Sequence, residues 1–496
     1  MDCLVVWTQI RSFLKGSIEA VLLGRPLHVK EYLDLEAFGK DRCRLPKDLR
    51  RKAFDMFEKY EAELRRRQMW DDADRVMDIL ARCDLKQLQP LSGCISDEMG
   101  DRDYDKVYVD EIQDCTQAET SLFFLAAGLQ VQSLFLAGDP AQAVVEGVDF
   151  RFEEVRSIVY KLSQGRETLD RPMKLFVNYR SHAGILQCAS AVIEKMCAAY
   201  PGSARVLPPD SGHSQGPRPA YFMMTDTNSV ELRTILANNE RLVVLCLDEA
   251  NRTAVLSESG GGSVFGIREA KGLEFPDVVV LDFFSGIPGA DQKVWKTLLA
   301  ADDHQISQSS WSPQVETQLK LLYTAITRSC NRLIFIETQQ SVAGSSFFSW
   351  LQAKRLAEPL LFQEEAAGQV MTGDEWRARG LDCAVSAEGP SAIPLLQSAV
   401  QCFTRAKDTK LLDRASAELE LKVLMQRWEG KKADEKRLDR SHEKEVAVLL
   451  EKLLKNELYV EALDLCEAMG SMSSHLDELH EHITSRLKGL NTHQKL

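Results

Sequence analysis

The sequence predicts a mixed α/β protein whose parallel sheets are flanked by an N-terminal helical segment and an all-α C-terminal tail. Between residues 105 and 337, short apolar runs alternate with helical stretches, as in a doubly wound sheet. Residues 28–83 and the chain after residue 345 instead carry apolar side chains at three- and four-residue steps. The runs expected to be strands are 107–109, 134–136, 175–177, 242–245, 278–281 and 333–336.

The length of 496 residues favours several domains over one. Residues 1–7 are apolar but lack a basic leader and a small-residue cleavage site, so we expect a buried strand there rather than a secretory signal. The predicted segments are 1–100, helical and part of the first α/β domain; 101–172, a partial α/β domain; 173–345, a second α/β domain; and 346–496, the helical tail.

Charge and cysteine content narrow the class of protein. A net charge of −13 argues against a protein that coats nucleic acid over its whole surface, but it leaves room for a local basic groove. The 12 cysteines include no C-x-x-C pair, so we expect reduced thiols in the nucleus or cytoplasm rather than a zinc site. No apolar run approaches the roughly 20 residues that span a membrane, and we expect no membrane partner.

Paired carboxylates follow the first predicted strand of the α/β region. Asp110 and Glu111 come directly after residues 107–109. In many NTPases such a pair holds Mg²⁺ through the aspartate, while the glutamate orients and deprotonates the attacking water. An acidic pair on an ordinary protein surface is the alternative interpretation.

The next two predicted strands also end in polar residues. Gly138, Asp139 and Gln142 follow the second strand, where a glycine permits close approach to a phosphate and an amide can contact a terminal phosphate. Arg180 follows the third strand and can neutralise charge on a phosphoryl group. The alternatives are an ordinary Gly-Asp-Pro turn and a surface ion pair.

Two more strings complete an ordered set. AKGLEF, residues 270–275, precedes the fifth predicted strand, and LYTAITRS, residues 322–329, precedes the sixth as a helix with Arg328 near its end. Together with DEIQD, GDPAQ and NYRS, they occur in the order of motifs II to VI of superfamily-1 helicases. Residues 100–340 therefore resemble the UvrD, Rep and PcrA branch of that superfamily, whose motor domains are RecA-like.

This resemblance implies roles for the candidate residues. Asp110 would coordinate Mg²⁺, Glu111 would be the catalytic base, and Gln142 would contact the γ-phosphate of ATP. Arg180 and Arg328 would be arginine fingers.

The same resemblance implies that Gly138, Asp139, Gly272 and Glu274 contribute to cofactor binding, with Glu274 near the ribose. It also implies that single-stranded nucleic acid, whether DNA or RNA, is the partner of the motor.

Departures from the family pattern leave two functions open. Gly266 and Arg268 replace the usual T-x-H of motif V, and no G-x-x-x-x-G-K-[ST] phosphate loop occurs in the sequence. We therefore expect an incomplete first sheet in an N-terminally truncated chain, with weak or no ATP hydrolysis by the chain alone. The alternative is a catalytically silent helicase-like scaffold.

The tail carries a further pattern. Ala399, Phe403 and Ala406 reproduce the A-x3-F-x2-A core of a tetratricopeptide repeat, with Trp376 and Gly380 upstream at a fitting mutual spacing. The sequence thus predicts weak helical repeats that offer a surface to a protein partner. A plain helical bundle is the alternative.

Overall fold

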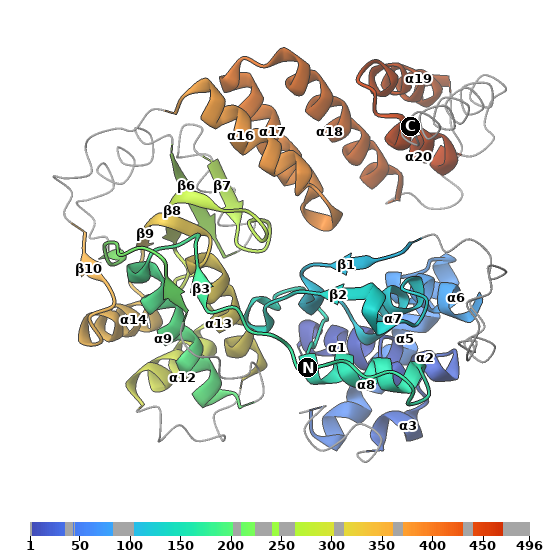
Figure 1. The fold of residues 1–496 in the computed structure, drawn as a ribbon, viewed down its shortest axis with the longest axis horizontal. Coiled ribbons are helices and arrows are strands. Elements are labelled where there is room, and N and C mark those ends of the chain that lie inside the picture. Colours follow the sequence, from blue (N-terminus) through green and yellow to red (C-terminus); the bar gives the residue numbers. More distant parts are fainter. Residues whose placement is uncertain are drawn as a thin grey trace. The chain divides into compact units, whose positions relative to one another are not determined.

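The fold is described from a computed structural model, drawn in Figure 1, and its contacts group the chain into two compact units. The first unit comprises residues 1–224 and 280–360, and the second comprises residues 225–279 and 361–496. The residues that the structure describes are 2–34, 43, 45–82, 104–201, 210–223, 241–247, 263–301, 312–360, 371–429 and 440–469.

The first unit begins with helices rather than with the strand expected for residues 1–7. Helix α1 (Cys3–Thr8) starts where the Asp2 carboxylate accepts the amide of Leu4 at 2.7 Å, and it continues into a π-helical segment, Gln9–Lys15. The prediction was wrong because the apolar residues Val6, Ile10 and Leu14 recur at helical steps and pack into one core. The helices that follow are α2 (Ile18–Leu23), α3 (Val29–Leu33), α5 (Lys47–Arg67) and α6 (Asp72–Arg82).

A two-stranded parallel sheet follows these helices. Strands β1 (Val107–Val109) and β2 (Leu134–Leu136) pair in register, with Val107 opposite Leu134. One face packs against a core that includes Ile112 and Phe150, and the neighbouring helices are α7 (Gln117–Ala126) and α8 (Phe152–Leu162). The other face exposes Tyr108 and Phe135 by 73% and 58%. Parallel sheets are normally covered on both faces, and among the described residues this one has two strands and one packed face.

A second sheet contains six strands in the order β10-β5-β9-β8-β6-β7, and each pair with a described register is parallel. Helices α9 and α13 pack against β9, and α12 packs against α9 and α13 (Figure 1). The six strands are β5 (Ala220–Met223), β6 (Leu242–Cys246), β7 (Ser263–Gly266), β8 (Phe275–Leu281), β9 (Ser329–Glu337) and β10 (Glu358–Pro359). The helices of this region are α9 (Ala183–Ala199), α12 (Gly289–Ala300), α13 (Pro313–Ile326) and α14 (Val342–Ala353).

The C-terminal tail is helical, as expected. Its elements are α16 (Gly373–Val385), α17 (Ala392–Ala406), α18 (Thr409–Glu429), α19 (Arg440–Lys455) and α20 (Tyr459–Met469). Consecutive helices α16, α17 and α18 pack on one another (Figure 1). Gly380 permits a close approach of α16 to α17, since a Cβ there would lie 2.6 Å from the ring of Phe403. The repeat-like spacing in the sequence therefore corresponds to a close contact between two helices.

Five of the six predicted strands are confirmed as β1, β2, β6, β8 and β9. The prediction for residues 175–177 was wrong in position and burial. The strand there, β3, is Val177–Asn178; among the described strands it pairs with β4 (Ser211–Gly212) alone, and Leu175 is 84% exposed.

The predicted α/β class with parallel sheets and helical ends is confirmed. The boundaries of the four predicted segments stay predictions. Among the described helices, none combines the length and apolar character that a membrane span requires.

Candidate functional site

The carboxyl end of β1 holds the predicted acidic pair. Asp110 is exposed, and its Oδ1 accepts the backbone N–H of Glu111 at 2.9 Å. Glu111 is half-buried and has a φ of 54°, a left-handed conformation that is uncommon for a residue with a side chain. Such strain is concentrated at functional positions, and here it turns the chain sharply at the end of the strand.

Gln113 joins the loops after β1 and β2, a role that the sequence did not reveal. Its side chain is fully buried; Nε2 donates to the Glu111 carboxylate, and Oε1 accepts the Asp139 N–H at 2.9 Å. A Cβ on Gly138 would lie 2.2 Å from Gln113 Oε1, so the glycine is required for this contact. The only signal in the sequence was the position of an amide residue two places after Glu111.

Asp139 is bound by groups of the protein itself. Its carboxylate accepts the N–H of Ala141 at 3.0 Å, Nε2 of Gln142 at 3.0 Å and the hydroxyl of Tyr323 at 3.2 Å. Burial raises the pKa of Asp139, although these donors oppose that rise. The assignment of Asp139 to cofactor binding stays a prediction; in the structure its carboxylate contacts the Gln142 side chain.

Arg328 reaches the same place from the end of α13. It is 2% exposed; its Nε donates to the carbonyl of Thr324 at 3.1 Å, and Nη2 donates to Gln142 Oε1 at 2.8 Å. Burial, followed by the positive charge of Arg180, lowers the pKa of Arg328 to about 10, and the charge of Glu111 opposes this effect. These influences require Arg180 and Glu111 to lie close to Arg328.

The fold therefore brings most of the predicted site together. Arg180 itself is exposed at a turn in which the Asn178 side chain accepts the Arg180 N–H at 2.9 Å. Gly272 and Glu274 belong to the second unit. There, Gly272 has a φ of 80°, which favours glycine, and Glu274 is exposed. The pKa of Asp382 on α16 is raised by burial first and then by the charge of Glu274.

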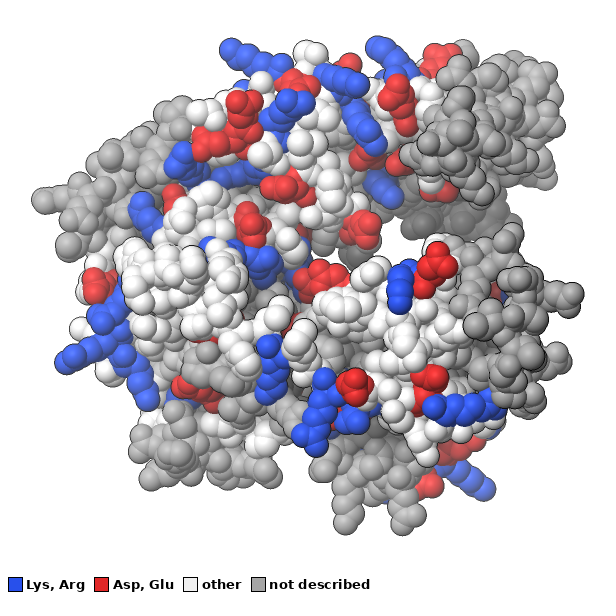
Figure 2. All heavy atoms as spheres, viewed as in Figure 1, with Lys and Arg blue, Asp and Glu red and all other residues white. Residues whose placement is uncertain are grey.

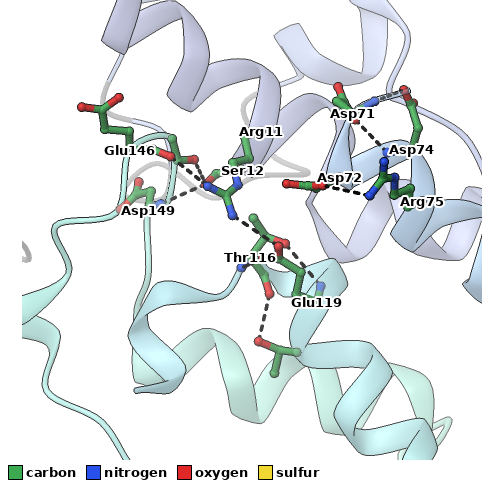
Figure 3. A network of polar contacts seen from close by, with 12 residues as sticks. Arg11, Ser12, Asp71, Asp72, Asp74, Arg75, Thr116, Glu119, Glu146 and Asp149 are labelled. Carbon is green, nitrogen blue, oxygen red and sulfur yellow. Dashed lines mark hydrogen bonds and ion pairs between the residues drawn. The ribbon is translucent and has the colours of Figure 1, made fainter. Parts of the chain in front are cut away.

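The loop after Gln142 is fixed by the N-terminal π-helical segment, as Figure 3 shows. Arg11 donates to the carbonyl of Glu146 at 3.0 Å, and Ser12 donates to the carbonyl of Gly147 at 2.6 Å. The Asp149 N–H in turn donates to the Ser12 hydroxyl at 2.9 Å. Nothing in the sequence pattern had pointed to these contacts, which join residues more than 130 positions apart.

Neither the surface charge nor the described cavity marks the position of the site. On the face drawn in Figure 2, acidic and basic side chains are interspersed. A cavity of about 420 Å³ has Lys195 and Trp350 in its lining, but none of the predicted catalytic residues lines it. The candidate site therefore consists of the residues at the ends of β1 and β2 and at the end of α13.

Comparison with known proteins finds a related protein among the curated ones. No protein-family model matches the chain. The chain is 31% identical to human TPR and ankyrin repeat-containing protein 1 in an alignment 426 positions long, which covers 76% of this chain and 14% of that protein. The chain thus spans a small part of the curated relative that it matches. The name of that relative refers to the kind of repeat that the tail sequence predicts.

Proposed function

We propose that this chain is the catalytic and arginine-finger part of a UvrD-like ATPase that acts on nucleic acid. The observation that carries the proposal is the convergence of Glu111, Gln142 and Arg328, from three separate sequence strings, at the end of a parallel sheet. Ligands of α/β sheets bind at the carboxyl ends of the strands, where Asp110 and Glu111 follow β1.

The residues fit Mg²⁺ and ATP in a limited sense. Among the described residues, Asp110 Oδ2 has no hydrogen-bond partner, so Asp110 is suited to hold Mg²⁺, which would neutralise charge on the phosphates. Glu111 is aimed by Gln113 and would take a proton from water. Arg328 and Arg180 would stabilise the charge that develops on the transferred group.

The phosphates of ATP would need a further element. A phosphate loop supplies clustered N–H donors and a lysine, and this sequence contains no such motif. We propose that full activity requires a polypeptide that contains this motif. Single-stranded nucleic acid is the proposed partner of the motor, on the strength of the motif resemblance alone.

A catalytically silent scaffold is the second candidate. It is favoured by the missing phosphate loop and by the well-packed pair α16 and α17, in which Gly380 meets the buried ring of Phe403. In this case the tail would bind a protein partner, and ATP would not be hydrolysed.

ATP hydrolysis stimulated by nucleic acid distinguishes the two candidates. We would compare this chain with an N-terminally extended version that includes a G-x-x-x-x-G-K-[ST] sequence, each with single-stranded DNA and with RNA. The proposal predicts stimulated hydrolysis by the extended version and weak or no hydrolysis by this chain. If the extended version binds nucleic acid but does not hydrolyse ATP, the scaffold is the better account.

A further inference from the structure

Four side chains form a continuous hydrogen-bond chain between the loop after β2 and helix α13. The Tyr323 hydroxyl donates to Asp139 Oδ2 at 3.2 Å, and Gln142 Nε2 donates to the same oxygen at 3.0 Å. Gln142 Oε1 then accepts Arg328 Nη2 at 2.8 Å. The two ends of this hydrogen-bonded series, Tyr323 and Arg328, come from one stretch of the sequence. Tyr323 is 7% exposed and Arg328 is 2% exposed.

The orientation of the Gln142 amide follows from its two neighbours. Asp139 offers only acceptor oxygens when ionised, and Arg328 offers only donors. If the amide were reversed, its oxygen would face a carboxylate and its nitrogen would face a guanidinium. Because Arg328 and Tyr323 are buried, little water is present to satisfy the mismatched groups.

Both carboxylate oxygens of Asp139 accept hydrogen bonds from groups of the protein itself. Oδ1 accepts the Ala141 N–H, which fixes the short helical turn Pro140–Gln142, and Oδ2 accepts both Gln142 and Tyr323. Tyr323 supplies a contact to the loop from within α13, and Arg328 supplies a second from just beyond the end of that helix. Removing the Tyr323 hydroxyl would leave Gln142 bound to Asp139 and Arg328 but would remove the contact between α13 and Asp139.

We infer that Tyr323 and Asp139 are positioning residues, which fix the Gln142 amide so that its oxygen, and not its nitrogen, meets Arg328. The inference concerns the same site as the proposed ATPase and gains its catalytic meaning from that function. It adds that Gln142 and Arg328 respond to a phosphate as one unit, because a change at either side chain moves the other through a shared hydrogen bond.

An exchange of carboxylate and amide tests the orientation directly. In Asp139→Asn the new amide oxygen is held by the Ala141 N–H, so the new amide nitrogen faces the Gln142 amide, donor against donor. In Gln142→Glu two carboxylates face each other instead. When both substitutions are combined, the amide at position 139 donates to the carboxylate at position 142, which still accepts Arg328. Net charge is the same in the double variant as in the parent.

We would measure the urea unfolding midpoints of this chain and of the three variants, with Tyr323→Phe as a further case and Tyr160→Phe as an exposed control. Each single exchange is expected to lower the equilibrium constant for folding at least about tenfold, and the double variant is expected to recover most of that loss. If the equilibrium constant for folding of the double variant is as low as the two single losses multiplied together, the inference is overturned.

Catalysis gives a second, separate readout. In the extended version, Tyr323→Phe is expected to lower kcat about tenfold with a smaller change in KM, since it disturbs positioning rather than binding. An unchanged kcat with measurable activity would also overturn the inference. If the double variant recovers the stability lost in the single variants but no version hydrolyses ATP, the proposed ATPase function is wrong and the positioning of Gln142 is still supported.

Discussion

Replacement of Lys15 by methionine removes a buried positive charge from the N-terminal helices. The Lys15 side chain is fully buried, and its Nζ lies 2.9 Å from Glu61, 2.7 Å from Asp71 and 2.5 Å from Asp74. These carboxylates come from α5 and from the start of α6, so the ammonium joins the π-helical segment to both helices. The three carboxylates lie close enough together to suggest a metal site, but the lysine already occupies their centre.

The size of the effect follows from the burial of the partners. Loss of one member of a buried ion pair typically costs about 3–5 kcal/mol, because the remaining charge is uncompensated. The Glu61, Asp71 and Asp74 side chains keep 19%, 10% and 28% exposure, so water partly screens them. We therefore expect Lys15→Met to lower the free energy of unfolding by about 3 kcal/mol at neutral pH, the lower end of that range.

The pKa shifts of Lys15 and Asp71 determine how this loss of stability depends on pH. Burial acts to lower the pKa of Lys15, but its three carboxylate partners outweigh burial and raise it above 10.5. Burial acts to raise the pKa of Asp71, but the bond to Lys15 and other donors lower it below 3.8. The contribution of Lys15 is thus complete between these two values. It is lost as the pH rises through the raised lysine pKa or falls through the lowered aspartate pKa.

Urea unfolding at neutral pH, followed by circular dichroism, measures the predicted change. Lys59→Met is the matched control, because Lys59 is exposed on α5 and has no ion pair among the described residues. The control is expected to stay within about 0.5 kcal/mol of the parent. A loss below about 1 kcal/mol for Lys15→Met would refute the account, since such values are typical of exposed ion pairs.

Two other changes test the tail and the second sheet. Gly380→Ala should destabilise the tail by about 1–3 kcal/mol, because its Cβ would lie 2.6 Å from the ring of Phe403. Gly373→Ala is the comparison, because its Cβ would meet its nearest atom at 3.7 Å, and it should be neutral or stabilising. Thermal denaturation of both variants measures the difference. Burial raises the pKa of Glu337 to about 7 from 4.5, so its native state binds the extra proton between these values. Stability should therefore fall by on the order of 3 kcal/mol as the pH rises through that window, and Glu337→Gln should abolish this slope in denaturation midpoints.

Strands with continuous apolar runs could be predicted from the sequence. The runs at 242–245, 278–281 and 333–336 are buried on both sides and form β6, β8 and β9. Strand β7 was missed because Ser263–Gly266 contains only two large apolar residues. Residues 1–7 were misread because a short apolar run fits a strand as well as a buried helix.

The sequence predicted which strings would lie together but not the hydrogen bonds that connect them. The order of the strings pointed to Glu111, Gln142 and Arg328, which the fold brings close together. The roles of Gln113 and Tyr323 depend on contacts between loops and a helix that lie far apart in the sequence. No local spacing encodes such a contact, so only the fold could reveal it.

The most direct test of the central claim is Glu111→Gln in the N-terminally extended version. Glu111 is held by Gln113 at the end of β1, and it is the proposed base of ATP hydrolysis. Glu388→Gln, an exposed substitution in the tail, is the control. We predict that Glu111→Gln lowers kcat for stimulated ATP hydrolysis about 10²–10⁴-fold while ATP still binds, and that the control keeps the parental rate. An unchanged kcat for Glu111→Gln would contradict the assignment of this site.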